Sequence, residues 1–244
     1  MSSAVSCSLL HWASWMPGVV SAADWQAWAA GALPIGDTEE NPSVDFIPAM
    51  QRRRLSRLSR FALAAAHACV DEPRGLPTVF ASRHGEIHRT VGLLKDLARQ
   101  EPLSPMAFSL SVHNTASGLH SIVTGNTAPS TAVAAGTDTL PMAFIEAVGQ
   151  LQYHERVLLV YAEEPLPEDY RTFATDCVPL GLALLLGRSG TAHAPQLHLS
   201  MEPTASNTVV EHNTLPWLRW LVASTGELHT SGERFTWQWT WQKP

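Results

Sequence analysis

The stretch PMAFSLSVHNTASGLHSIVTGNTAPSTAVAAGTDTLPMAFIEAVGQL, Pro105–Leu151, decides the fold. Within it, the run of small residues Ser130–Ala135 (STAVAA) predicts a short strand. Gly136 follows at once, and apolar residues at helical spacing then run over Thr137–Tyr153. A strand that passes through a glycine into a helix predicts a sharp turn at Gly136, the local geometry with which many α/β enzymes expose a nucleophile.

Strand and helix patterns alternate along the rest of the chain up to Gly187. The strongest helical pattern is Met50–Val70, whereas Ser104–Val112 is expected to be extended and the acid-rich Glu163–Tyr170 to be a surface loop. The other expected elements are strands at Ala4–Trp15, Pro77–Ser82, Arg156–Tyr161 and Val178–Leu186, and helices at Ala22–Ala30, Gly85–Arg99 and Thr115–Val123. This order predicts an α/β fold with a mixed, mostly parallel sheet flanked by helices.

The sequence changes character beyond Gly187. Phe235–Gln242 (FTWQWTWQ) alternates aromatic and polar residues, so it predicts a strand that places Trp237, Trp239 and Trp241 on one face. That face packs on the core of the domain or, as the alternative, forms an edge that meets a partner. We therefore divide the chain into a main domain, 1–188, and a small C-terminal β/α extension, 189–244, that packs on it or on a partner.

Composition and charge exclude several classes of protein. The chain has 244 residues and a formal net charge of −6, which disfavours binding to nucleic acid. Its cysteines, Cys7, Cys69 and Cys177, are widely spaced in apolar runs, so we expect buried thiols without disulfides. The N-terminus lacks the features of a signal peptide, and no apolar run approaches the about 20 residues that cross a bilayer. We expect a cytoplasmic protein with no membrane span, metal or cofactor.

Four segments, in their order and spacing, resemble those of β-ketoacyl synthases, the condensing enzymes of fatty-acid and polyketide synthesis. They are the arginine-rich Ile47–Leu58 (IPAMQRRRLSRL), Ala81–Glu86 (ASRHGE), Ser109–Gly118 (SLSVHNTASG) and Val133–Thr139 (VAAGTDT). The last segment matches the strand and turn that carry the cysteine nucleophile of that family. The resemblance is greatest to short, amino-terminal-only members that act like chain length factors beside a full ketosynthase in bacterial aryl polyene systems. It implies a thiolase-like half-domain.

The departures from the family pattern point to a function without catalysis. The nucleophile position is Gly136, which has no side chain to acylate. The H-G-T-G-T histidine motif of the family is absent, and the nearest string is His84-Gly85-Glu86. The resemblance therefore implies no catalytic residue and no condensing activity of the chain alone. It implies a chain-length-factor-like subunit that forms a heterodimer with a catalytic ketosynthase, shapes the acyl product sterically and meets an acyl carrier protein.

Residues near the turn are candidates for the wall of a substrate tunnel or pocket. These candidates are His113, Asn114, Gly136, Thr137 and Asp138. Each also has a structural interpretation, because Gly136 suits an ordinary turn and the His113-Asn114 pair suits a hydrogen-bonded turn. For Asp138, we favour capping of the following helix over a catalytic role.

Two further groups are candidates for protein contacts. Arg53, Arg57 and Arg60 share one face of the expected helix and form a candidate docking patch for the acidic carrier protein. The alternative is a solvated face paired with the acids of Asp37–Asp45. In the strand before the turn, the small residues Thr131, Ala132 and Ala134 are candidate dimer contacts, because they allow a partner strand to approach closely.

Two other functions stay open on the sequence alone. An independent acyl-transfer or hydrolytic enzyme would use His113 with a nearby serine, although no G-x-S-x-G motif is present. A free-standing module that binds an acyl group or a carrier protein would use the arginine patch without a ketosynthase.

Overall fold

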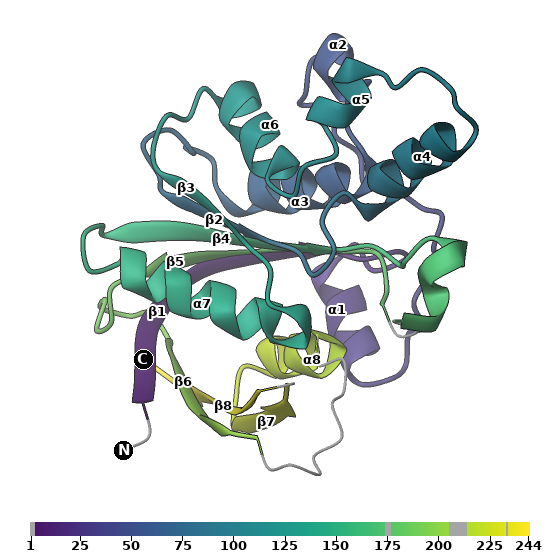
Figure 1. Ribbon diagram of the computed structural model, residues 1–244. Helices are drawn as coiled ribbons and strands as arrows, with labels where there is room; N and C mark the ends of the chain where they lie inside the picture. Colours follow the sequence, from purple (N-terminus) through teal and green to yellow (C-terminus); the bar gives the residue numbers. More distant parts are fainter. Residues whose placement is uncertain (1–2, 174–176, 205–213, 233) are drawn as a thin grey trace.

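The computed structural model describes residues 3–173, 177–204, 214–232 and 234–244, and Figure 1 shows a single sheet between layers of helices. The strands are β1 (Ser3–Trp15), β2 (Thr78–Ala81), β3 (Ser130–Val133), β4 (Arg156–Glu163), β5 (Leu180–Gly187), β6 (Gln196–Pro203), β7 (Glu227–Ser231) and β8 (Phe235–Gln242). The helices are α1 (Ala22–Ala29), α2 (Ala49–Arg52), α3 (Arg57–Cys69), α4 (Ile87–Ala98), α5 (Pro105–Ser109), α6 (Thr115–Thr124), α7 (Thr139–Gln150) and α8 (Thr214–Ala223). Two 3-10 turns, η1 (Gly136–Asp138) and η2 (Glu168–Phe173), complete the elements.

The sheet is mixed, as expected, but its parallel part is small. The strand order is β3-β2-β4-β5-β1-β6-β8-β7, and only β2 pairs in parallel, with β3 and with β4. The remaining neighbours are antiparallel. The expectation of mostly parallel pairing is therefore wrong. Its physical reason lies after β4, because the described part of the connection to β5 contains no α-helix and the chain returns in the opposite direction.

Two hydrophobic layers cover the sheet because successive side chains of each strand point to opposite faces. Along β4, Leu158 and Val160 pack with Phe61 of α3, whereas Leu159 packs in the other cluster with Phe144 of α7. Figure 1 shows α3 and α6 on one side of the sheet, and α7, α8 and α1 on the other. The parallel strands β3, β2 and β4 therefore lie between two helix layers, with their carboxyl ends along one edge.

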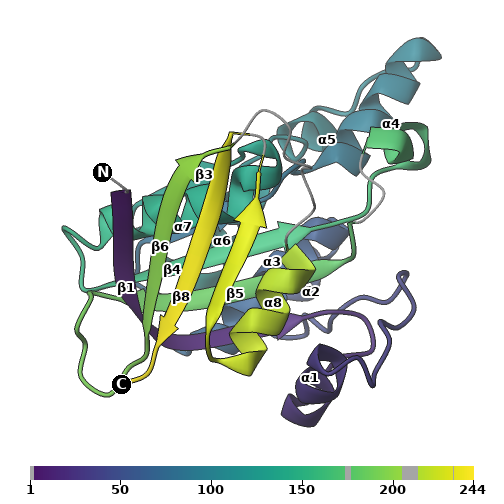
Figure 2. The same ribbon diagram turned by 90° about the horizontal axis from the view of Figure 1, so that it is seen from below.

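The C-terminal strands extend the same sheet at a steep angle. The 13-residue β1 pairs with β6 through its first half and with β5 through its second, and the register shifts at a bulge between Leu9 and His11. Figure 2 shows β6, β8 and β7 side by side, turned away from β4 and β5. Trp239 is buried against Phe144 of α7 and Trp217 of α8, and Trp237 is buried in the same hydrophobic cluster. The core-facing interpretation of this strand is therefore confirmed for both. The division of the chain at residue 188 stays a prediction.

Three local expectations are wrong. The helix expected over Met50–Val70 is broken into α2 and α3, because the Ser56 hydroxyl accepts a hydrogen bond from the Ser59 amide (3.0 Å) and starts a new helix. Ser104–Val112 contains helix α5, which begins with a Ser104 cap followed by Pro105. The expected surface loop Glu163–Tyr170 overlaps the end of β4, and its first two acids, Glu163 and Glu164, are buried.

Other expectations hold in the described residues. All three cysteines are buried, and none of them forms a disulfide within the described residues. No helix in the described part of the chain is long and apolar enough to cross a membrane. Ser21 caps α1 in a capping box, and Gly125, in the left-handed conformation, ends α6.

Candidate functional site

The predicted strand, turn and helix around Gly136 are confirmed. β3 ends at Val133, Gly136 adopts φ +58°, and α7 begins at Thr139 after one 3-10 turn. The Thr139 hydroxyl accepts a hydrogen bond from the Ala135 amide (2.9 Å) and donates one to the Gly136 carbonyl (2.7 Å). Because a positive φ is costly for residues with a side chain, glycine is the residue that this turn favours.

Asp138 points toward the C-terminal strands and does not cap α7. Its side chain forms no cap hydrogen bond, is only 3% exposed and accepts a hydrogen bond from the Trp237 indole Nε1 (2.7 Å). The carboxylate also packs directly on Gly232, where a Cβ atom would lie 1.5 Å from Oδ1. The capping interpretation is therefore wrong, because the buried indole N–H requires an acceptor and Asp138 supplies it.

The space beneath the turn is filled by aromatic side chains. A cavity of about 20 Å³ remains there, which is room for about one water molecule. It is lined by Thr137, Leu140, Pro141, Thr214, Trp217, Thr230, Trp237 and Trp239. An acyl chain does not fit in such a space, so in this chain the interior side of the turn is closed.

His113 and Asn114 lie apart from the cavity at Thr137. The His113 Nε2 donates a hydrogen bond to the Ser82 carbonyl (2.8 Å), and the ring packs on Gly85, where a Cβ would lie 2.7 Å from the imidazole carbon Cδ2. His113 lines a separate cavity of about 10 Å³, and Asn114 is exposed. His113 and the residues of the turn therefore line different cavities. The hydrogen bond of His113 to Ser82 supports the structural interpretation.

A buried acid at the end of β4 was not found by sequence reasoning. Glu163 is 1% exposed, accepts a hydrogen bond from the Arg83 amide (2.8 Å) and lies 3.8 Å from the Cys177 thiol. Burial raises the pKa of Glu163 from 4.5 to about 7. Tyr161, whose hydroxyl lies 3.2 Å from that of Thr214, is buried in the same cluster. The one sequence signal for this group is an acid that directly continues a buried strand.

Arg57 belongs to a partly buried ion-pair network. Its guanidinium donates to the Thr38 carbonyl (2.5 Å) and lies 3.4 Å from the buried Glu164 and 4.0 Å from Glu39. These contacts tie the loop before α2 to the end of β4. For Arg57, therefore, the ion-paired alternative describes the structure.

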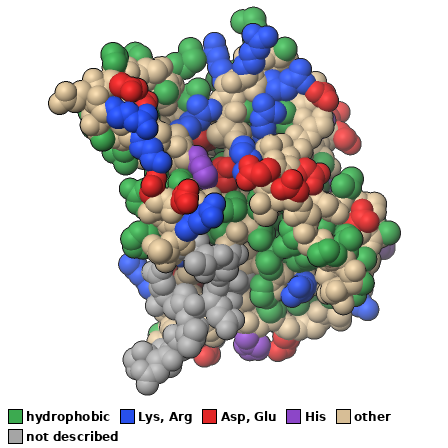
Figure 3. Space-filling model, turned by 90° about the vertical axis from the view of Figure 1, so that its right-hand side faces the viewer, with side chains coloured by type: hydrophobic (Ala, Val, Ile, Leu, Met, Phe, Trp, Pro, Cys, Tyr) green, Lys and Arg blue, Asp and Glu red, His purple; other side chains and the backbone are tan. Residues whose placement is uncertain are grey.

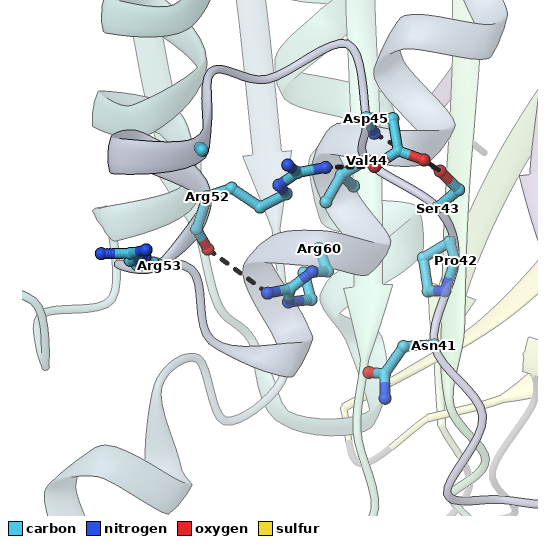
Figure 4. A pocket seen from close by; sticks show the side chains of 9 residues that line it. Asn41, Pro42, Ser43, Val44, Asp45, Arg52, Arg53 and Arg60 are labelled. Atoms are coloured by element: carbon cyan, nitrogen blue, oxygen red, sulfur yellow. Dashed lines mark hydrogen bonds and ion pairs between the residues drawn. The ribbon is translucent and has the colours of Figure 1, made fainter.

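The other two predicted arginines lie around a hollow between α2, α3 and the preceding loop (Figure 4). Arg53 is in the turn between the two helices and is exposed, whereas Arg60 is on α3 and donates to the Arg52 carbonyl (3.3 Å). Arg52, which was not among the candidates, forms an ion pair with Asp45. The expectation that Arg53, Arg57 and Arg60 share a helix face is wrong, because the helix is interrupted before Arg57.

The strand before the turn presents a free edge. In the described sheet, β3 is the terminal strand and its one neighbour is β2. Ala132 and Ala134 are exposed, whereas the Thr131 hydroxyl accepts a hydrogen bond from Gln150 of α7 (3.1 Å). The structure therefore places the two alanines where a further strand has access.

The serines available to a hydrolase form other hydrogen bonds. Ser117 and Ser130 bond to each other (2.6 Å), and Ser121 donates to the Asn126 carbonyl (2.6 Å). Ser109 and Ser111 donate to main-chain carbonyls of α5. Within the residues that the structure describes, no group of three His, Cys, Asp or Glu side chains is placed to hold a metal ion.

Comparison with known proteins gives one family and several related structures. The model of the β-ketoacyl synthase N-terminal domain matches residues 25–240. A structure of the ketosynthase ApeO in complex with its chain length factor ApeC, from Xenorhabdus doucetiae, is 28% identical, with a TM-score of 0.81 over 96% of this chain and 99% of that chain. None of the curated proteins matches the sequence.

More distant structures share the fold alone. The ishigamide ketosynthase/chain length factor is 16% identical, with a TM-score of 0.64 over 83% of this chain and 68% of that chain. A β-ketoacyl synthase from Burkholderia phymatum STM815 is 12% identical, with a TM-score of 0.65 over 91% of this chain and 71% of that chain.

Proposed function

Because this chain belongs to the β-ketoacyl synthase N-terminal domain family, with the thiolase-like fold that its sequence predicts, we propose that it acts as a chain-length-factor-like subunit of a ketosynthase. In this proposal, a catalytic ketosynthase supplies the nucleophile and the histidines, and this chain supplies part of the wall that limits the acyl product. Synthesis of an aryl polyene or a related acyl chain, in the cytoplasm, is the setting that the sequence resemblance favours.

The observation that carries this proposal is the turn at Gly136. The strand, the turn and the helix of a nucleophile elbow are present, but the residue at its apex has no side chain to acylate. Behind the apex, Trp237 and its neighbours leave about 20 Å³. A chain that keeps this scaffold and fills its interior is suited to packing against another subunit, not to holding a thioester of its own.

The exposed edge of β3 is the proposed site of contact with the ketosynthase. Ala132 and Ala134 present little bulk there, so a partner strand can pair with the free backbone groups. One exposed apolar side chain lies next to this edge: Ile122, 66% exposed, on α6, which contacts β3. An exposed apolar side chain beside a free strand edge suits contact with another protein.

Co-expression with a full ketosynthase tests the proposal. We expect the two chains to purify together as a one-to-one complex, and we expect Ala134→Trp to abolish this complex because its bulk prevents the close approach of the partner strand. Ala98→Trp, at an exposed position near the end of α4, is the matched control and should leave the complex intact. If the chain stays monomeric when it is co-expressed with each co-encoded ketosynthase, the proposal is wrong.

A second element of the proposal is contact with an acyl carrier protein. It is supported by Arg53 and Arg60, which are basic side chains at a surface hollow of a chain whose net charge is −6. Opposite charge steers an acidic carrier toward such a site. If the carrier binds this chain equally well with and without the ketosynthase, a free-standing carrier-binding module becomes the better description.

A further inference from the structure

The hollow between α2, α3 and the loop that precedes them has a volume of about 620 Å³. Its polar lining includes Asp45, Arg52, Arg53 and Arg60. Figure 4 shows Arg52 of α2 reaching toward Asp45 on the opposite loop, Arg60 on α3, and Arg53 in the turn after α2, with its guanidinium group pointing away from the other two. Figure 3 shows basic side chains gathered at the top of the molecule, where α2 lies in Figure 1, above a band of acidic ones.

Two of these three arginines carry positive charge that no carboxylate within the described residues neutralises. Arg52 is paired with Asp45. Arg60 donates to a main-chain carbonyl, and no ion pair of Arg53 occurs in the described part of the chain. The lining therefore carries three positive charges and one negative charge, an excess of two.

The other acids of the preceding loop are engaged away from the hollow. Glu39 faces Arg57 (4.0 Å), and Glu40 accepts a hydrogen bond from the Gly18 amide (3.0 Å). The Asp37 carboxylate accepts from the Glu39 amide (2.9 Å). The loop thus uses its negative charges to hold its own shape and to hold Arg57. Among the residues that the structure describes, Arg53 and Arg60 have no ion-pair partner.

We infer that this hollow binds a phosphate ester. A phosphate monoester carries about −1.5 to −2 charges at neutral pH, which matches the excess of two, whereas one carboxylate would neutralise half of it. Guanidinium groups are suited to phosphate because they donate two parallel hydrogen bonds. The volume also leaves room for an organic body, which Pro42, Val44 and Ala49 would contact. This inference deepens the proposed contact with an acyl carrier protein. It rests on the proposed function only in taking the carrier as one source of the ester.

A titration of the isolated chain with inorganic phosphate, in phosphate-free buffer, tests the site. We expect the arginine Nε signals of Arg53 and Arg60 to shift in NMR spectra. The double substitution Arg53→Ser and Arg60→Gln should weaken phosphate binding at least about tenfold, the effect of losing one charge-assisted hydrogen bond or more. Arg99→Ser removes an exposed arginine at the end of α4 and should leave the affinity unchanged.

A substitution of opposite sign makes the test sharper. Asp45→Asn removes the one negative charge of the lining and should tighten phosphate binding about threefold or more, because it frees Arg52. The site is wrongly assigned if phosphate does not shift these signals, if Arg99→Ser weakens binding as much as the double substitution, or if acetate binds as tightly as phosphate.

The source of the ester is decided by two further ligands. Coenzyme A, whose 3′-phosphate is a monoester, serves as the free phosphate ester. A carrier protein with and without its phosphopantetheine group serves as the carried one, a phosphodiester whose single negative charge would neutralise half of the excess. Tighter binding of the modified carrier, lost in the double variant, assigns the site to the carried ester, and binding of coenzyme A alone assigns it to a free one. These titrations use no ketosynthase, so their failure leaves the proposed pairing with a ketosynthase intact, and failure of that pairing leaves the phosphate site intact.

Discussion

The hydrogen bond between Trp237 and Asp138 joins the turn to the C-terminal strands, and Trp237→Phe removes it. The bond is 2.7 Å long, and its acceptor is a carboxylate that is 3% exposed. A hydrogen bond to a charged group contributes about 1.5–3 kcal/mol, and the smaller ring forfeits roughly 1 kcal/mol of packing. We expect a loss of about 3 kcal/mol in the free energy of unfolding, which for a chain of this size lowers Tm by about 6–12 °C.

Thermal unfolding of two variants side by side isolates the hydrogen bond. Trp239→Phe is the matched control, because Trp239 is buried to the same degree in the same cluster and its indole forms no hydrogen bond in the described structure. It should lower Tm by about 2–4 °C, the effect of roughly 1 kcal/mol of lost packing. Equal losses of Tm in the two variants would refute the claim that Asp138 and Trp237 hold the turn and the C-terminal strands together.

Two further predictions concern the pH dependence of stability and the chemistry of the turn. The folded-state pKa of Glu163 is about 7 against 4.5, so the folded protein keeps a proton that the unfolded chain releases, and stability falls as pH rises from 4.5 to 7 by up to about 3 kcal/mol. Burial lowers the pKa of His120 from 6.5 to about 4, which makes stability rise with pH over much of the same window. The test therefore compares Glu163→Gln with the unaltered protein: the stability of the variant relative to that protein should grow from pH 4.5 to 7 and then stay level. A difference in urea midpoints that does not change with pH would contradict this. Gly136→Cys should lack condensing activity and lose about 1–2 kcal/mol of stability, because Gly136 has φ +58°; elongation of a thioester by this variant alone would show that the chain needs no partner.

Sequence patterns predicted the elements whose signals are local. The strand and helix around Gly136 follow from small residues, one glycine and helical spacing over Thr137–Tyr153. The break between α2 and α3 was missed because the apolar spacing runs through it, although Ser56 carried the signal of a new N-cap. The interpretation of Phe235–Gln242 succeeded because strict alternation places the tryptophans on one face.

Features that depend on distant partners were not predictable from local patterns. Asp138 follows a turn and precedes a helix, which favours a cap. Its carboxylate instead accepts a hydrogen bond from the indole of Trp237, 99 positions later in the sequence. The direction of β5 depends on the connection that follows β4. An apolar run does not indicate whether its strand pairs in parallel or antiparallel. The arginine hollow likewise forms only when α2, α3 and the loop before them come together.

The most direct test of the central claim is the length distribution of products made by a catalytic ketosynthase with and without this chain. Purified ketosynthase, carrier protein and acyl substrates would be combined with the chain, and the products on the carrier would be measured by mass spectrometry. If the chain is a non-catalytic wall, it makes no product alone, and its addition shifts and narrows the distribution of chain lengths. An unchanged distribution in its presence, or condensation by the chain alone, would contradict the claim.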